Sequence, residues 1–151
     1  MTTQRPDKAL NSHLLVGLQF ASIGVGLVPF SAPSGTQLWW IASALGVLVG
    51  LYTLLHNRLG NFGVYPEPLG HAELITSGPY RWVRHPMYLS LLLFMLGIAM
   101  YNGGLLNQLS LLTLLAAVLG KMQIEEAYLR ERFDSYAQYS AVSKRLLPYL
   151  Y

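Results

Sequence analysis

Four long apolar runs without a single charged residue constrain this chain more than any other feature. They cover residues 14–30, 38–55, 87–101 and 105–120. Each approaches the roughly 20 residues that a helix needs to cross about 30 Å of hydrocarbon, once its flanks are counted. A water-soluble domain of 151 residues has too small an interior to bury all four. The runs therefore predict an all-α integral membrane protein with about four transmembrane helices.

Composition agrees with this class and excludes several kinds of site. Hydrophobic residues make up 53% of the chain and charged residues 11%, a balance more apolar than soluble domains have. Cysteine is absent, which excludes disulfides, thiolate metal sites and cysteine nucleophiles. The four histidines lack metal-ligand spacing, so we expect no metal. The net charge of +3 is too small to indicate nucleic-acid binding.

The positive charges predict how the chain is oriented. All ten lysines and arginines lie before the first run, between the second and third, or after the fourth. The two remaining connections, SAPSGTQ and NGGLLNQ, carry no charge. By the positive-inside rule, both termini and the long central loop are then cytoplasmic. The polar first 13 residues lack the features of a signal peptide and read as a retained tail.

We expect one membrane domain over residues 1–151. Its predicted parts are an N-terminal helix pair (13–56), a cytoplasmic cofactor loop (57–85), a helical hairpin turning at NGG (86–122) and a cytoplasmic C-terminal amphipathic helix (123–151) that Pro148 ends. Small residues recur at four-residue spacing on the first two spans, at Gly17, Ala21, Ala42, Gly46 and Gly50. Such residues allow close helix approach in lipid. They favour either packing of this pair or a homodimer seam.

The stretch GPYRWVRHPMYLSLLL, residues 78–93, concentrates basic and aromatic side chains at the start of the third run. Pro86 can take the first helical position, where its missing amide costs nothing. Arg84 and His85 would then stand at the positive end of that helix, which favours an anion. Tyr88, one turn further on, can add a hydroxyl. This corner suits a carboxylate or a phosphate.

Two neighbouring acids follow the fourth run on the same predicted face of the membrane. Glu125 and Glu126 either pair with Lys121 and Arg130 on their own helix, or form one wall of a cavity whose other wall carries Arg84 and His85. The second arrangement would match a ligand that bears charges of both signs. Spacing alone leaves the two alternatives open.

Two sequence blocks resemble a known family. Residues 74–90, LITSGPYRWVRHPMYLS, contain the pattern Gly-x-Tyr-x-x-x-Arg-His-Pro-x-Tyr. Residues 124–148, IEEAYLRERFDSYAQYSAVSKRLLP, contain Glu-Glu-x-x-Leu and Phe-x-x-Tyr-x-x-Tyr. In this order they resemble the superfamily of isoprenylcysteine carboxyl methyltransferases and phospholipid methyltransferases, which are small integral-membrane enzymes that use S-adenosylmethionine. One departure is Ser90, where the family often has glycine.

The resemblance implies a site and a reaction. Its expected cofactor contacts are Leu74, Gly78, Tyr80, His85, Pro86, Tyr88, Glu125 and Glu126, and its expected catalytic residues are Arg84 and Glu126. S-adenosylmethionine would donate a methyl group to a lipid-like acceptor at the cytoplasmic face of the membrane, in bacteria the inner membrane. The acceptor group would be the carboxylate of a prenylcysteine-like compound or the amine of a headgroup.

Two other functions stay open at this stage. NADPH-dependent sterol reductases have a similar His-Pro-x-Tyr segment, but they carry an acidic residue later in that helix. This chain has Leu91 in that stretch and no acid in the third run. The other alternative is a non-catalytic membrane protein that binds a lipid or a partner.

Overall fold

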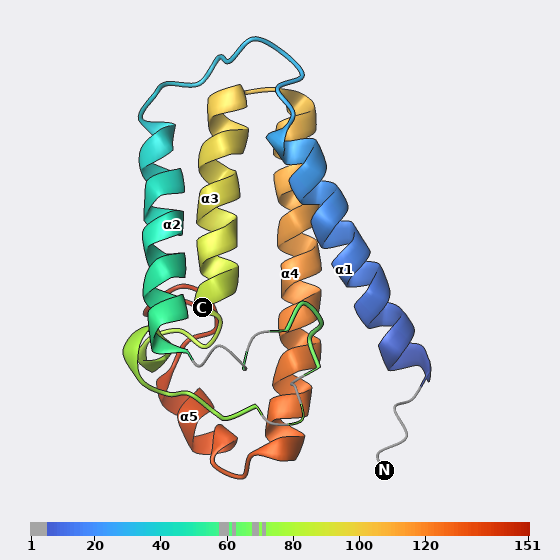
Figure 1. Ribbon diagram of the computed structural model, residues 1–151, viewed down its shortest axis with the longest axis vertical. Helices are drawn as coiled ribbons and strands as arrows, with labels where there is room; N and C mark the ends of the chain where they lie inside the picture. Colours follow the sequence, from blue (N-terminus) through green and yellow to red (C-terminus); the bar gives the residue numbers. More distant parts are fainter. Residues whose placement is uncertain (1–5, 58–60, 62, 68–69, 71) are drawn as a thin grey trace.

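The computed structural model describes residues 6–57, 61, 63–67, 70 and 72–151 (Figure 1). Five α-helices follow one another along the chain: α1 (Pro6–Leu27), α2 (Trp39–His56), α3 (Pro86–Asn102), α4 (Leu105–Arg132) and α5 (Tyr136–Val142). One 3₁₀ turn, η2 (Gly78–Arg81), precedes α3. Within these residues there is no β-strand, only an isolated bridge between Val83 and Lys144. The prediction of an all-helical protein is confirmed. His71, one of the four histidines, lies outside the described residues.

Three of the helices are long and apolar enough to cross a membrane, namely α1 over Leu10–Leu27, α2 over Trp39–His56, and α4. The remaining apolar helix, α3, has 17 residues, which at about 1.5 Å per residue gives roughly 25 Å. A helix of that length crosses only where the bilayer thins or its flanks help. The fourth crossing therefore stays a prediction.

The helices alternate in direction, so that the chain's connections fall at opposite ends of the bundle. Figure 1 shows the uncharged connections, 28–38 and 103–104, together at one end. The described part of the central segment, the start of α1, α5 and residues 143–151 lie toward the other end. This is the arrangement that four crossings would give. The cytoplasmic location of that end remains a prediction.

The small residues of α2 pack against α3. A Cβ atom at Gly46 would lie 2.5 Å from the backbone nitrogen of Phe94, and the Ser90 hydroxyl donates to the Gly46 carbonyl at 2.8 Å. α1 packs instead along α4. The expected packing of the first two helices on each other is therefore wrong, because the α3–α4 hairpin stands between them. A Cβ at Gly17 would meet nothing within 4 Å, and a homodimer seam stays a prediction.

The hairpin between α3 and α4 turns at NGG as predicted. Gly103 ends α3 with φ +69°, a left-handed conformation that glycine adopts without strain. The tight turn places α3 beside α4. Their shared core contains Met95, Ile98, Leu114, Val118 and Met122, joined by Leu146 from the C-terminal segment.

The C-terminal region is not one helix ended by Pro148, which corrects that prediction. α4 continues without a break to Arg132, and α5 ends at Val142. The helix is interrupted at residues 133–135, which include Asp134 and Ser135, two residue types with low helix propensity. The chain then runs beside the entry to α3, where the Lys144 N–H donates to the Trp82 carbonyl at 2.9 Å. This pairing satisfies backbone groups that the absent helix would otherwise have satisfied.

Candidate active site

The entry to α3 is held in place by the C-terminal segment. Pro86 is the first residue of α3, as predicted. Immediately before it, the Arg84 N–H donates to the Lys144 carbonyl at 2.7 Å and the His85 N–H to the Arg145 carbonyl at 3.1 Å. These two amides are therefore not free to bind an anion. The side chains of Arg84 and His85 remain to do so.

Glu126 lies beneath this corner, fully buried, and accepts hydrogen bonds from several basic groups. Arg84 Nε lies 3.0 Å from its carboxylate, Arg130 Nη2 3.0 Å, Arg145 Nη2 2.9 Å and His85 Nε2 3.3 Å. The hydrogen bonds to Glu126 raise the pKa of Arg145 above its already high ordinary value. Guanidinium groups thus compensate a charge that would be costly to bury alone.

Arg84 connects three elements. Besides Glu126 on α4, its Nη1 donates to the carbonyl of Ser140 at 3.0 Å on α5, and to the carbonyl of Ser143 just beyond α5. A planar guanidinium can satisfy several acceptors in fixed directions, which a lysine cannot. This side chain therefore sets the position of α5 relative to the start of α3.

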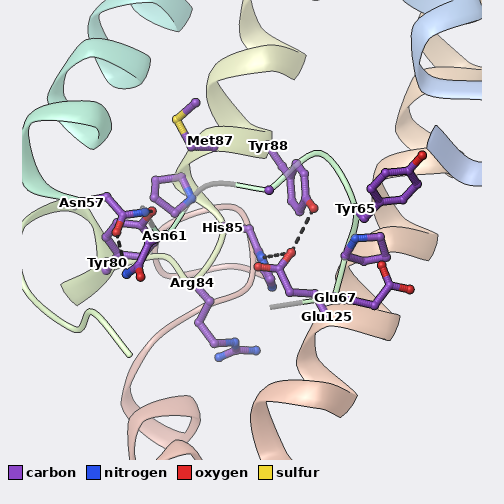
Figure 2. Close-up of a pocket in the computed structure, with 13 residues that line it drawn as sticks. Asn57, Asn61, Tyr65, Glu67, Tyr80, Arg84, His85, Met87, Tyr88 and Glu125 are labelled. Atoms are coloured by element: carbon purple, nitrogen blue, oxygen red, sulfur yellow. Dashed lines mark hydrogen bonds and ion pairs between the residues drawn. The ribbon is translucent and has the colours of Figure 1, made fainter. Parts of the chain in front are cut away.

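Above the corner lies a polar pocket made of two adjoining hollows. The first has about 560 Å³ of empty space with its open mouth included, and Figure 2 shows its lining. Its described lining is Asn57, Asn61, Gly63, Tyr65, Pro66, Glu67, Tyr80, Arg84, His85, Pro86, Met87, Tyr88 and Glu125. The second, of about 500 Å³, shares five of these residues and adds Glu73, Leu74, Ile75, Leu129, Tyr136 and Tyr139. Polar groups that converge on one concave surface are typical of ligand sites.

Glu125 presents an acidic group to this pocket, opposite the basic Arg84. The Glu125 side chain is 30% exposed, and its carboxylate accepts from the Tyr88 hydroxyl at 2.9 Å. His85 Nδ1 lies 3.8 Å from the same carboxylate, and Figure 2 draws both approaches. Arg84 and Glu125 line both hollows. The pocket thus offers charges of both signs to one ligand.

Amide and phenol groups form the opposite wall. The Asn57 side chain donates to the Tyr80 hydroxyl at 3.0 Å, and Asn61 donates to Asn57 at 3.0 Å. The Tyr139 hydroxyl donates to the Tyr80 carbonyl at 2.8 Å, and burial raises the pKa of Tyr139 to about 12. The Tyr136 hydroxyl is buried without a partner among the described residues. Buried hydroxyls are rarely unpaired, so an ordered water or a polar ligand atom would be the partner for this one.

The sequence-predicted site residues separate into two groups. Those that line the first hollow are Tyr80, Arg84, His85, Pro86, Tyr88 and Glu125, and Leu74 lines the second. Glu126 and Gly78 are in neither lining. Glu126 is the buried anchor just described. Gly78 has φ +59°, and a Cβ there would lie 2.2 Å from the His56 ring, so the turn into η2 requires glycine; its cofactor contact stays a prediction.

Several lining residues escaped the sequence reasoning. Tyr136 and Tyr139 belong to the second sequence block, and their presence in it was the signal that could have pointed to them. Asn57, Asn61 and Glu67 offer no such signal. They come from an irregular segment whose path follows no periodic pattern, so only the folded chain brings them to the pocket.

The comparison with protein families decides the class. A model of the family described as phospholipid methyltransferase matches residues 37–136. The chain belongs to this family. The match includes every described lining residue of the polar pocket except Tyr139, and it makes this phospholipid methyltransferase family member a membrane methyltransferase. No curated protein matches the chain.

Proposed function

We propose that this protein transfers a methyl group from S-adenosylmethionine to a lipid-like acceptor at the cytoplasmic face of the membrane. The observation that carries the proposal is the common pocket that Glu125 of α4 and Arg84, just before α3, line together. The proposed donor bears a sulfonium and an ammonium, which favour acidic neighbours, and a carboxylate, which favours a cation.

The pocket matches S-adenosylmethionine in its apolar and hydrogen-bonding groups as well as in its charges. Glu125 would hold a cationic group, while Arg84 and His85 would hold the carboxylate. The second hollow adds the apolar side chains Leu74 and Ile75 beside amides and phenols, a mixture suited to a nucleoside. The unpaired Tyr136 hydroxyl would donate to a polar atom there. When bound, the donor supplies an electrophilic methyl carbon.

The protein's own part in the reaction is to orient and to exclude water. A carboxylate or a free amine is already a nucleophile, so methyl transfer needs little acid–base help, and the rate comes mainly from positioning and dehydration. We assign Arg84 to ligand contact and Glu126 to holding Arg84 and His85 in place. The acceptor group remains a prenylcysteine-like carboxylate or a headgroup amine.

Ligand-dependent heat stability tests the proposal. We expect S-adenosylhomocysteine, the demethylated product, to raise the unfolding temperature of the detergent-purified protein. At a hundredfold excess over Kd, such a ligand raises the free energy of unfolding by about 2.7 kcal/mol. NADPH should not. Glu125→Gln should abolish the shift, because it removes the acidic wall.

The matched control is Asp134→Asn, which removes an exposed acid outside the pocket lining and should keep the shift. A wild-type protein that ignores S-adenosylhomocysteine would overturn the proposal, and a response to NADPH would support the reductase alternative. Transfer of a radiolabelled methyl group into a total lipid extract would then identify the acceptor.

A further inference from the structure

Residues 146–151 form a closed turn that is fixed to the bundle from the inside. Leu146 packs into the core that α3 and α4 share, and Arg145 Nη1 donates to the Tyr151 hydroxyl at 3.0 Å. The Leu147 N–H donates to the Tyr151 carbonyl at 2.7 Å, and the Tyr151 N–H donates back to the Leu147 carbonyl at 3.2 Å. These contacts fix which side chains the turn presents to its surroundings.

Tyr149 and Leu150 stand at the tip of this turn, where they are 85% and 80% exposed. Tyr149 has φ +68°, the one positive value at a described residue other than glycine. A bulky side chain is strained in this conformation, and strain of this kind gathers at functional positions. Glycine or asparagine would suit a tip that faces water better. The tip thus carries residues suited to a contact outside water.

The turn lies at the level where the spans end. η2 lies against the last residue of α2, since a Cβ at Gly78 would be 2.2 Å from the His56 ring, and α2 is long enough to cross a membrane. Trp82 directly follows η2, and its carbonyl accepts from the Lys144 N–H at 2.9 Å. Figure 1 shows the chain end marked C level with the last turn of α2 and the first turn of α3, whereas α5 lies farther from the spans. A bilayer around α2 would therefore have its headgroup region at this turn.

The surroundings of the turn are basic and aromatic. Arg81 and Lys144 are exposed, and among the described residues neither forms an ion pair. Trp82 between them is 50% exposed. Residues 74–90 and 135–151 contain no aspartate or glutamate. Tryptophan and tyrosine favour the headgroup region, and lysine and arginine next to a span attract anionic lipids.

We propose that these residues form an interfacial anchor, which lies in the headgroup region of the leaflet at the pocket end of the bundle and binds anionic lipid there. The anchor consists of Arg81, Trp82, Lys144, Tyr149 and Leu150. The side chains at the tip insert below the headgroups, and the two cations contact phosphate groups. A symmetric contact between two copies of the chain would instead bring like charges together, which is unfavourable. The inference does not depend on methyl transfer.

The anchor is joined to the candidate active site through residues 143–145. The Ser143 carbonyl accepts from Arg84, and Arg145 Nη2 lies 2.9 Å from the Glu126 carboxylate. Contact between the anchor and the bilayer therefore restrains the side chains below the polar pocket from outside. Anionic lipid that binds the folded chain stabilises this corner by mass action.

Spin labelling of the full chain in nanodiscs tests the location of the anchor. The chain has no cysteine, so that one label site can be introduced at a time. A nitroxide at Leu150→Cys should show a several-fold higher ratio of accessibility to oxygen over a water-soluble nickel chelate than one at Gln138→Cys. Gln138 is the matched control, because it is exposed on α5. Leu48→Cys, exposed on α2, gives the ratio for the apolar part of the bilayer.

The lipid headgroup tests the cations. We expect the label at residue 150 to lie deeper in phosphatidylcholine nanodiscs that contain phosphatidylglycerol than in phosphatidylcholine alone. Arg81→Gln combined with Lys144→Gln should abolish this difference. Arg132→Gln, which removes an exposed cation at the end of α4, should keep it. High salt should abolish the difference without any substitution, because it screens exposed charges, and this measurement covers the case in which the double variant does not fold.

A label at residue 150 that meets the nickel chelate as readily as the label at residue 138 would place the turn in water and overturn the inference. A label that neither reagent reaches would indicate a protein partner or a second copy, and would overturn it as well. A response to phosphatidylglycerol that survives both the double substitution and high salt would contradict recognition of anionic lipid.

Discussion

Glu125 and Glu126 are neighbours in sequence with different surroundings. Successive residues of an α-helix point about 100° apart, and here that rotation turns one carboxylate into the pocket and the other into the protein. Glu125 contacts Tyr88 at the edge of the open space. Glu126 is fully buried beneath basic groups. One acid is available for a ligand, and the other fixes the groups around it.

The main effect of Glu126→Gln should therefore be a lower free energy of unfolding, and not the loss of a single ligand contact. Loss of the buried carboxylate leaves Arg84 and Arg145 without their counter-ion, a change that typically costs about 3–5 kcal/mol. Thermal unfolding of the detergent-purified variant measures this. Arg130→Gln is the control, because the Arg130 side chain is 54% exposed and such pairs contribute at most about 1 kcal/mol. Equal unfolding temperatures for both variants would contradict the assigned anchor role.

At the scale of single residues, the sequence predicted those pocket residues that belong to a recognisable motif. The Arg-His-Pro-x-Tyr stretch and the first acid of the second block predicted pocket residues, because their chemistry is local and their place at a helix end is readable. Spacing could not separate Glu125 from Glu126. Which of them faces Arg84 from the open side depends on the rotation of α4 in the bundle, and apolar runs do not report that rotation.

Among the elements, the contact between α2 and α3 depends on glycine. Cβ atoms at Gly46 and Gly97 would lie 2.5 Å from the Phe94 nitrogen and 2.6 Å from the Trp39 carbonyl oxygen respectively. Both neighbours are backbone atoms, which cannot rotate away as a side chain can. The two helices are thus closer than any larger residue allows.

Gly46→Ala should destabilise the protein, by about 1–3 kcal/mol, because the extra methyl group forces the backbones apart. Gly17→Ala is a matched control in α1, where a Cβ meets nothing within 4 Å; there alanine should be neutral or slightly stabilising, since it favours helix. Unfolding of both variants in the same detergent gives the comparison. A Gly46→Ala protein as stable as Gly17→Ala would show that α2 and α3 are further apart than described.

At the scale of helices, the sequence predicted which segments are helical better than it predicted which helices pack together. The apolar runs, Pro86 and the NGG turn predicted α3 and its hairpin closely. The pairing of α2 with α3, and of α1 with α4, was missed because small residues indicate a close approach without naming the neighbour. The break after Arg132 and the bridge from Val83 to Lys144 were missed because they join irregular segments far apart in the chain.

In the molecule as a whole, a polar pocket lies at one end of a bundle and an apolar cleft opens on its side. They meet at Tyr88. Tyr136 and Tyr139 are buried beside the polar pocket, and Tyr80 is half-buried. The hydrogen bond from the Tyr139 hydroxyl to the Tyr80 carbonyl joins α5 to η2. Burial is the first cause of a raised pKa at each of them.

These tyrosines predict a loss of structure at alkaline pH. A tyrosine whose pKa is raised in the folded protein stabilises it fully below its ordinary pKa of 10.0. That contribution is lost as pH rises toward about 12, the pKa of folded Tyr139. Tyrosinate absorbance and circular dichroism, recorded together between these values, should show late ionisation coupled to loss of helix. Ionisation of all ten tyrosines at one ordinary pKa, with helicity unchanged, would contradict this.

The bond from Arg84 to the Ser143 carbonyl joins residues 59 positions apart, with the whole of α3, α4 and α5 between them. During synthesis the ribosome therefore delivers the first half of this corner well before the second. Until residues 143–145 emerge and dock beside residues 82–85, Arg84 lacks the Ser143 carbonyl and Glu126 lacks Arg145. The side chains below the pocket are then not held in place. Any activity that depends on this corner can therefore begin only after the C-terminal segment has docked.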